Sequence, residues 1–317
     1  METKTPKRTA VTPAQEDARA KQTGQPPRSL RSGPGRPGLT RWRHRVRLGP
    51  LLRPWVAAAV GFLFLVPILW MLITSVASDA DVFTFPPRLW PAWDFSNYAR
   101  AWGKSPWLAY FGNTVLIAGC VVLLVLITSL LAGFAFALMR FRGKGALFLL
   151  VMSAMMVPQT VLLIPNFIIA QKLGWYDTYL IQIIPWGASV FGIFLLRQFF
   201  LTLPKELFEA AEIDGAGPIR MLFSVAAPLA APSLVLVGLN SFMGSWNAFV
   251  WPYIMTKSDA VRPIEVGLQA FYGTEGTDWT GLCAAVSFTT LPIIVLFLFL
   301  QKYFVTGTYG TQGSVRG

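Results

Sequence analysis

The chain is poor in ionisable side chains and in metal-binding groups. Of its 317 residues, 13% are charged and 54% are hydrophobic, a composition that excludes an ordinary soluble domain and is typical of membrane proteins. It has one histidine, His44, and two cysteines, Cys120 and Cys283, which both lie in apolar stretches. This leaves no histidine cluster for a metal, and it indicates neither a disulfide framework nor a CxxC metal site.

Acidic residues are also scarce, and the resulting net charge of +12 lies mainly at one end of the chain. Residues 1–53 hold 13 of the 27 lysines and arginines and three of the 15 acidic residues. They are rich in proline and glycine and have no sustained apolar period, so we predict a disordered basic cytoplasmic tail. Its arginines next to the first apolar run favour an anchor on the anionic lipid membrane over the alternative of RNA binding.

Long apolar runs dominate the rest of the sequence. A helix needs about 20 apolar residues to cross a hydrocarbon layer of about 30 Å. Six segments qualify, at about 54–77, 111–138, 147–170, 178–196, 231–254 and 281–300. We therefore predict an all-α polytopic membrane protein with six transmembrane helices. Residues 54–110 would form the first of them with an outer loop, residues 111–302 the core, and residues 303–317 a cytoplasmic C-terminal tail.

The distribution of charge predicts the orientation of these spans. With both termini in the cytoplasm, 21 lysines and arginines lie on the inner side and six on the outer side, in agreement with the positive-inside rule. The first outer loop contains four tryptophans, whose amphipathic rings are suited to the headgroup level, so we expect interfacial helices there. These tryptophans are Trp90, Trp93, Trp102 and Trp107.

None of the six predicted spans contains Asp, Glu, Lys, Arg or His. An ion-coupled carrier usually keeps such a group in the membrane despite a cost of about 3 kcal/mol, and a membrane enzyme needs acids, bases or metal ligands. Both of these alternatives are therefore disfavoured. We predict a protein that is not an enzyme and that receives its driving energy from outside the helix bundle.

Polar side chains do occur on the fifth predicted span. Asn240, Gly244 and Asn247 are spaced i, i+4 and i+7, and Trp246 flanks this stripe. Amides hydrogen-bond sugar hydroxyls, and aromatic rings pack on the C–H faces of sugars, so the residue types suit a pathway for a carbohydrate or polyol. Packing between helices explains the same pattern equally well.

The third predicted span carries two further amides. Gln159 and Asn166 lie seven residues apart, and each follows a proline. This spacing predicts a kinked helix whose freed backbone groups and amides share one face toward a solute pathway. A helix that is bent only to fit its neighbours is the alternative.

The loop between the fourth and fifth predicted spans, residues 197–228, is amphipathic. Pro204 and the carboxylates of Glu206 and Glu209 indicate a helix that begins near Leu203. Gly215, followed by Gly217 and Pro218, ends it. The pattern alone predicts a helix, a sharp turn and a second helix on the surface.

The stretch EAAEIDGAGPIRMLFSVAAP within this loop resembles the EAA loop of importer-type ABC permeases. The matching residues are Glu209, Ala210, Ala211, Asp214, Gly215 and Pro228, whereas Val225 and Ala227 replace the usual Ile and Leu. The stretches FLLRQFFLTLPKEL, residues 194–207, and FLQKYFVTG, residues 299–307, are similar to the carbohydrate branch related to the maltose permease MalG. The resemblance covers residues 54–317.

This resemblance implies one permease half of a type I importer in a bacterial cytoplasmic membrane. Its partners would be a second permease subunit in a heterodimer, two ATPase subunits that bind ATP and Mg, and an extracytoplasmic solute-binding protein. No cofactor would bind to this chain. The solute would be a sugar or oligosaccharide, or alternatively a polyol such as glycerol phosphate. The EAA helix would be the coupling helix that contacts the ATPase, through Glu209, Ala210, Ala211, Asp214 and Gly215.

Overall fold

The structure, a computed structural model, describes residues 52–274 and 276–309. Nearly all of the predicted basic tail and the last eight residues lie outside this part. The chain divides into two units, Met1–Val60 and Gly61–Gly317. Of the first unit, only the beginning of helix α2 is described, and the contacts discussed below all belong to the second.

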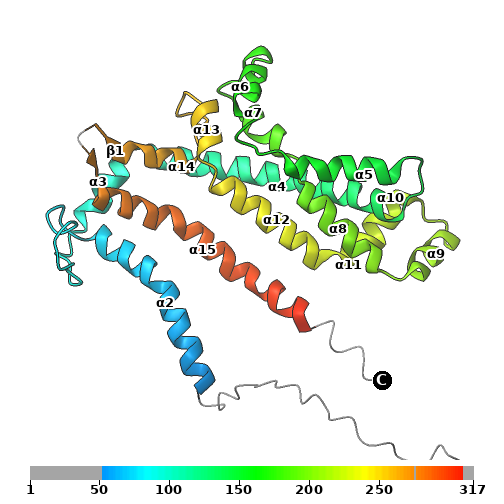
Figure 1. Ribbon diagram of the computed structural model, residues 1–317, viewed down its shortest axis with the longest axis horizontal. Helices are drawn as coiled ribbons and strands as arrows, with labels where there is room; N and C mark the ends of the chain where they lie inside the picture. The colour runs from blue at the N-terminus through cyan, green and yellow to red at the C-terminus, as the bar shows by residue number, and fades with distance from the viewer. Residues whose placement is uncertain (1–51, 275, 310–317) are drawn as a thin grey trace, which may run out of the picture. The chain divides into compact units, whose positions relative to one another are not determined.

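The described residues are almost entirely helical (Figure 1). The longer helices are α2 (Leu52–Ser75), α4 (Trp107–Leu138), α5 (Lys144–Ser153), α6 (Leu163–Lys172), α8 (Val190–Thr202), α12 (Ala231–Trp246) and α15 (Trp279–Tyr309). The shorter helices are α3 (Ser96–Gly103), α7 (Tyr179–Ile183), α9 (Lys205–Ile213), α10 (Pro218–Met221), α11 (Ala227–Leu229), α13 (Val250–Met255) and α14 (Ile264–Gly267). Two-residue strands, β1 (Tyr272–Gly273) and β2 (Gly276–Thr277), pair antiparallel.

Within the described ranges, four helices are long and apolar enough to cross a membrane, and a bent pair would make a fifth. The four are Pro54–Ser75, Trp107–Leu138, Tyr179–Thr202 and Trp279–Phe299. The pair joins Pro218–Leu229 to Ala231–Trp246 with a bend of 83°. These lengths and compositions agree with the predicted multi-span helical protein, whereas the count of six remains a prediction.

The third predicted span, 147–170, is not one helix, so the prediction of a single kinked helix was wrong. After α5, a short 3-10 turn ends at Met156, and α6 starts only at Leu163. Pro158 contributes to the break, because a proline disfavours the helical region for the preceding residue. Val157 is indeed extended, with φ −85° and ψ 115°.

Two other boundaries differ from those predicted. Helix α8 continues six residues beyond the predicted end at Leu196, and it therefore contains Arg197. The guanidinium of Arg197 donates to the backbone oxygen of Phe136 at 3.1 Å and lies 4.1 Å from the ring centre of Phe148, which satisfies the charge near the helix end. Helix α15 runs to Tyr309, past the predicted start of the C-terminal tail at residue 303.

Helices α4, α8 and α12 form the largest core. Its fully buried members include Val125, Leu196, Phe200 and Val237. Two glycines allow the backbones to approach closely, as is common between membrane helices. A Cβ on Gly133 would lie 2.9 Å from the Cβ of Leu196, and one on Gly192 would lie 2.9 Å from a methyl carbon of Val237.

Substitution Gly192→Val is expected to destabilise this core, because the added methyl groups have no space between α4 and α12. Overpacking of this kind costs about 1–3 kcal/mol. Thermal unfolding of the purified protein in detergent would show a lowered Tm. Gly119→Val is the matched control on α4, since a Cβ at Gly119 meets no atom within 4 Å. Equal Tm values for both variants would contradict the close packing.

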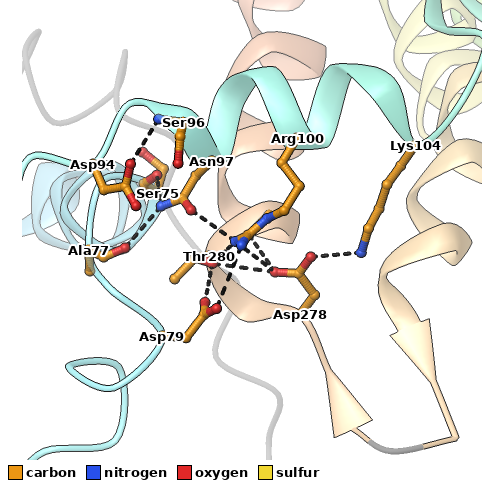
Figure 2. A network of polar contacts seen from close by, with 11 residues as sticks. Ser75, Ala77, Asp79, Asp94, Ser96, Asn97, Arg100, Lys104, Asp278 and Thr280 are labelled. Carbon is orange, nitrogen blue, oxygen red and sulfur yellow. Dashed lines mark hydrogen bonds and ion pairs between the residues drawn. The ribbon is translucent and has the colours of Figure 1, made fainter.

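A second region joins the end of α2 to the starts of α3 and α15 (Figure 2). The Asn97 side-chain amide donates to the backbone oxygens of Ser75 and Ala77 at 3.1 and 2.9 Å. Arg100 donates to the side-chain oxygens of Asn97 and Thr280 at 2.9 and 2.7 Å. The short helix α3 therefore connects the first predicted span to the last through hydrogen bonds.

The tryptophans of the predicted outer loop separate into two groups. Trp90, Trp93 and Trp102 are exposed, and a helix, α3, does lie within this loop. Its position at a membrane interface remains a prediction. Trp107, in contrast, is only 1% exposed and packs edge-on against Tyr110. Placing Trp107 at the headgroup level was therefore wrong, because this ring belongs to the protein core.

Asp278 precedes α15 and carries the negative charge of the same network (Figure 2). It accepts from Lys104 at 2.7 Å and from the backbone N–H of Gly281 at 2.9 Å, and Arg100 lies 3.5 Å away. Partial burial acts to raise the pKa of Asp278, but these hydrogen bonds and the two cations outweigh it and hold the pKa below its usual value of 3.8.

Because the pKa of Asp278 is lowered on folding, its stabilising contribution is present above the usual carboxyl range and is lost as pH falls through the lowered value. Asp278→Asn is therefore expected to lower the Tm at pH 7, with a difference from the parent protein that is constant down to about pH 5. Below pH 4 the two Tm values should converge. Glu212→Gln, which removes an exposed carboxylate of α9 that makes no ion pair among the described residues, is the control. A difference that grows on acidification would contradict this assignment.

Candidate functional site

Helix α9 and the turn that follows it occupy the segment that resembles the EAA loop. The helix begins at Lys205, two residues after Leu203, because Pro204 has an extended ψ of 134° and stands at the N-cap. Its end agrees with the sequence-based expectation. Gly215 adopts φ +77°, a conformation that glycine adopts far more readily than other residues.

The turn after α9 closes with two backbone hydrogen bonds. The N–H of Gly215 donates to the oxygen of Glu212 at 3.0 Å, and the N–H of Ala216 donates to the oxygen of Ala211 at 2.9 Å. This pair of bonds is the Schellman motif, which satisfies carbonyls at a helix end and fixes the direction of the exit. The turn is thereby held in one conformation.

The predicted coupling residues lie on the surface of this segment. Glu209, Ala210, Asp214 and Gly215 are exposed, and Ala211 is half-buried. Two large apolar side chains beside them are exposed as well, Ile213 at 87% and Ile219 at 72%. The segment therefore exposes apolar as well as charged side chains.

The opposite side of the segment is anchored in the core. Phe208 of α9 packs against the α4–α8–α12 core, with its ring centre 6.3 Å from that of Phe134. After α10, residues Leu222–Ala226 form a π-helix, a rare geometry that is frequent at functional sites. Leu222, Ala226 and Ala230 are at most 2% exposed within the same core. The turn is therefore linked mechanically to both α4 and α12.

A cavity of about 660 Å³ lies among α4, α12, α13 and the segments that interrupt the helices. Its polar lining consists of hydroxyl and amide side chains, namely Thr114, Gln159, Gln182, Ser189, Asn240, Ser241 and Ser245. Aromatic rings of Trp186, Phe249 and Trp251 contribute to the walls. None of the described lining residues is charged. Such a surface hydrogen-bonds neutral polar molecules and gives no counter-ion to a charged one.

The predicted pathway residues do not all meet at this cavity. Asn240, Gly244 and Gln159 line it. Trp246 is instead 2% exposed and packs against Phe111 and Phe242.

Asn247 and Asn166 are not among the lining residues. Helix α12 ends at Trp246, and Asn247 is its C-cap. The break after Met156 separates Gln159 from Asn166, which lies within α6. The predicted single-helix face of the third span was therefore wrong as geometry. On the fifth span, Asn240 and Gly244 share the cavity, and Asn247 does not line it.

Sequence reasoning missed Gln182, Ser189 and Thr114. Gln182 and Ser189 are polar residues seven apart in the fourth predicted apolar run. The amides of the third run, Gln159 and Asn166, have the same spacing. Thr114 gives a weaker sequence signal, because threonine is common in apolar helices. Its role in the cavity wall depends on contacts between distant segments.

Comparison with known proteins decides the family. The family described as "Binding-protein-dependent transport system inner membrane component" matches residues 125–308, which is more than half of the chain. The chain belongs to this family. The match extends from the middle of α4 to the end of α15 and includes α9, so the resemblance indicated by the EAA loop is confirmed.

Curated relatives of the permease include three with named solutes. It is 36% identical over 208 residues to the arabinooligosaccharides permease AraQ of Halalkalibacterium halodurans, covering 66% of this chain and 74% of AraQ. It is 33% identical to the trehalose/maltose permease MalG of Thermococcus litoralis, covering 82% and 95% of the two chains. It is 30% identical to the sn-glycerol-3-phosphate permease UgpE of Yersinia pestis, covering 79% and 92%.

Solved structures share the fold. A chain of a bacterial ABC transporter involved in the import of the acidic polysaccharide alginate superimposes with a TM-score of 0.70 at 24% identity, covering 80% of this permease and 95% of that chain. A chain from the alginate transporter in complex with an alginate pentasaccharide-bound periplasmic protein gives a TM-score of 0.58 at 14% identity, covering 78% and 91%. The permease therefore has the fold of an ABC importer chain.

Proposed function

We propose that this permease subunit moves a neutral sugar or oligosaccharide across the bacterial cytoplasmic membrane as part of an ATP-driven ABC importer. The observation that carries the proposal is the cavity, which is lined by hydroxyls, amides and aromatic rings and has no charged side chain among its described lining residues. These groups match the hydroxyls and C–H faces of a saccharide. The names of AraQ and MalG support the same solute class.

The alternative solute is an anionic polyol, as the name of UgpE suggests. A phosphate or carboxylate in a cavity without a cation would lose hydration and gain no ion pair, which is strongly unfavourable. The lining of this permease therefore favours a neutral solute over glycerol phosphate, and over an acidic polysaccharide such as alginate.

Solute class is tested most directly on the solute-binding protein that operates with this permease. We expect maltose, trehalose or arabinotriose to raise its Tm, with a stabilisation of about 2.7 kcal/mol at a ligand concentration of 100 Kd. Neither sn-glycerol 3-phosphate nor an alginate trisaccharide should do so. Stabilisation by the anionic compounds alone, measured in the same thermal-shift series, would contradict the proposed solute class.

The proposed topology has six spans, with both termini and α9 in the cytoplasm. The bias of lysine and arginine toward the inner side supports this arrangement. Helices α5 and α6 together would form the third span, and the bent pair of α10–α11 with α12 would form the fifth. Non-helical backbone at membrane depth is tolerated where it lines a cavity, as the residues between α5 and α6 do.

The proposed partners are a second permease subunit, two ATPase subunits and an extracytoplasmic solute-binding protein. The family description supports dependence on a binding protein. Helix α9 and its turn would contact the ATPase through Glu209, Ala210, Ala211, Asp214 and Gly215. The exposed Ile213 and Ile219 enlarge this contact with apolar surface. Because Phe208 and the π-helix join the segment to the core, movement of the ATPase would be transmitted to the helices that line the cavity.

Substitution Ile213→Glu tests the coupling surface. Ile213 is 87% exposed, so the folded permease should tolerate the change, whereas a carboxylate buried against the ATPase costs several kcal/mol. We expect loss of ATPase co-purification and of solute-stimulated ATP hydrolysis by at least about tenfold. Lys205→Glu, which places the same side chain at the other end of α9, is the control. Full stimulated hydrolysis in the Ile213→Glu complex would refute the coupling role of this surface.

A further inference from the structure

Gln182 is a polar residue of the cavity wall whose amide is buried and has a hydrogen-bond partner at its nitrogen but not at its oxygen. The side chain lines the cavity and is 3% exposed. Its Nε2 donates to the backbone oxygen of Val261 at 2.7 Å. A carbonyl oxygen only accepts hydrogen bonds, so the nitrogen must face Val261 and the amide oxygen must face elsewhere.

The amide oxygen of Gln182 has no hydrogen-bond donor within reach among the described residues. A buried acceptor without a donor is unfavourable, and polar groups in protein interiors are rarely left so. The side chain lines the cavity, but its oxygen is buried in this arrangement, so a donor from the cavity can reach it only when a neighbouring segment of the chain moves. The other described lining residues of the cavity are uncharged, so the donor best matched to the site is the hydroxyl of a neutral molecule.

Val261 belongs to a strap, residues 256–263, that several side chains hold against the helices. Asn113 of α4 donates to the backbone oxygens of Ala260 and Arg262 at 3.0 and 2.9 Å. The hydroxyl of Tyr179 lies 3.0 Å from the oxygen of Ala260. The bond from Gln182 is therefore one of several that hold the strap, and it is the one whose donor also lines the cavity.

We propose that Gln182 binds the solute directly, by exchanging the Val261 carbonyl for saccharide hydroxyls when the strap moves away. The oxygen of the amide then accepts from one hydroxyl, and the released Nε2 donates to another. This inference rests on the proposed function and adds to it a residue that forms hydrogen bonds with the hydroxyl groups of the solute. The exchange pairs both polar groups of the Gln182 amide, whereas only Nε2 is paired while the strap is in place.

Uptake by the complete complex in proteoliposomes tests the proposal, with ¹⁴C-maltose and ¹⁴C-arabinotriose as probes. Gln182→Met keeps the length of the side chain and removes both hydrogen-bonding groups. We expect it to lower the uptake rate of the transported probe about tenfold. Tyr179→Phe also loses a strap bond, but Tyr179 does not line the cavity, so uptake should fall less than twofold.

A second measurement separates solute binding from a role in holding the strap. In a Cys120→Ser, Cys283→Ser background, the thiol of Gln182→Cys is reacted with methyl methanethiosulfonate in complexes trapped with vanadate. The transported saccharide should slow this reaction at least threefold. Leu180→Cys, which is exposed and outside the cavity lining, should react at one rate with and without saccharide.

The outcomes distinguish the two proposals. If neither probe is taken up and neither stabilises the solute-binding protein, the proposed function fails, and the role of Gln182 with it. If a probe is taken up but Gln182→Met keeps more than half of the rate, only the role of Gln182 is overturned. Slow uptake without protection of the cysteine would also overturn it, because Gln182 would then act on the strap alone.

Discussion

The close packing of α4 against α8 and α12 is the contact on which the rest of the molecule depends. Gly133 and Gly192 remove the side chains that would hold these helices apart, and burial of Leu196, Phe200 and Val237 fills the space between them. Without a hydrophobic driving force between helices in lipid, such fitted contacts are the main source of attraction. The same core includes Val121 and Val125, which also line the cavity.

The cavity lies where helices are interrupted. Its lining includes Val157 and Gln159 from the break after α5, Ala188 and Ser189 before α8, and Ala248 after α12. A bilayer offers no hydrogen bonds to free backbone groups, so interruptions need partners from the protein or a polar cavity. One such partner is visible beside α8, where the hydroxyl of Thr128 lies 2.9 Å from the backbone oxygen of Gly187. The breaks in the helices and the polar lining of the cavity therefore occur together, because the free backbone groups at a break need polar partners.

Hydropathy predicted the helices that run uninterrupted through an apolar run. The runs at 54–77, 111–138 and 281–300 correspond to α2, α4 and α15. The run at 147–170 is also long and apolar, but it is divided at Pro158, and a sliding average over apolar residues does not register one missing hydrogen-bond donor. The helix end at Gly215 was predictable because it depends on one residue and not on an average over many. Its positive φ is a local property that glycine adopts most readily.

The candidate site was less predictable, because it depends on contacts between segments far apart in the sequence. Asn240 and Gln159 share a cavity although neither helical period nor spacing relates them. The amide of Gln182 is oriented by its hydrogen bond to the backbone oxygen of Val261, 79 residues away. Trp246 was predicted to lie on the pathway but is buried in a hydrophobic cluster. The sequence does not separate the two positions, because an aromatic ring next to a polar stripe packs equally well into a core. Residue type therefore identified the kind of surface but not which side chains form it.

The proposed coupling follows from how few rigid links join the turn after α9 to the cavity. Phe208 contacts Phe134 on α4, and the π-helix leads into α12. Both helices carry cavity residues, Val125 on α4 and Asn240 on α12. In the proposed coupling, a displacement of α9 would move two walls together, because packed helices shift as rigid bodies. The predicted spans carry no acid or base that could titrate, and we propose that forces applied at the surface set the arrangement of these walls, with α9 as the anchored element that exposes apolar side chains there.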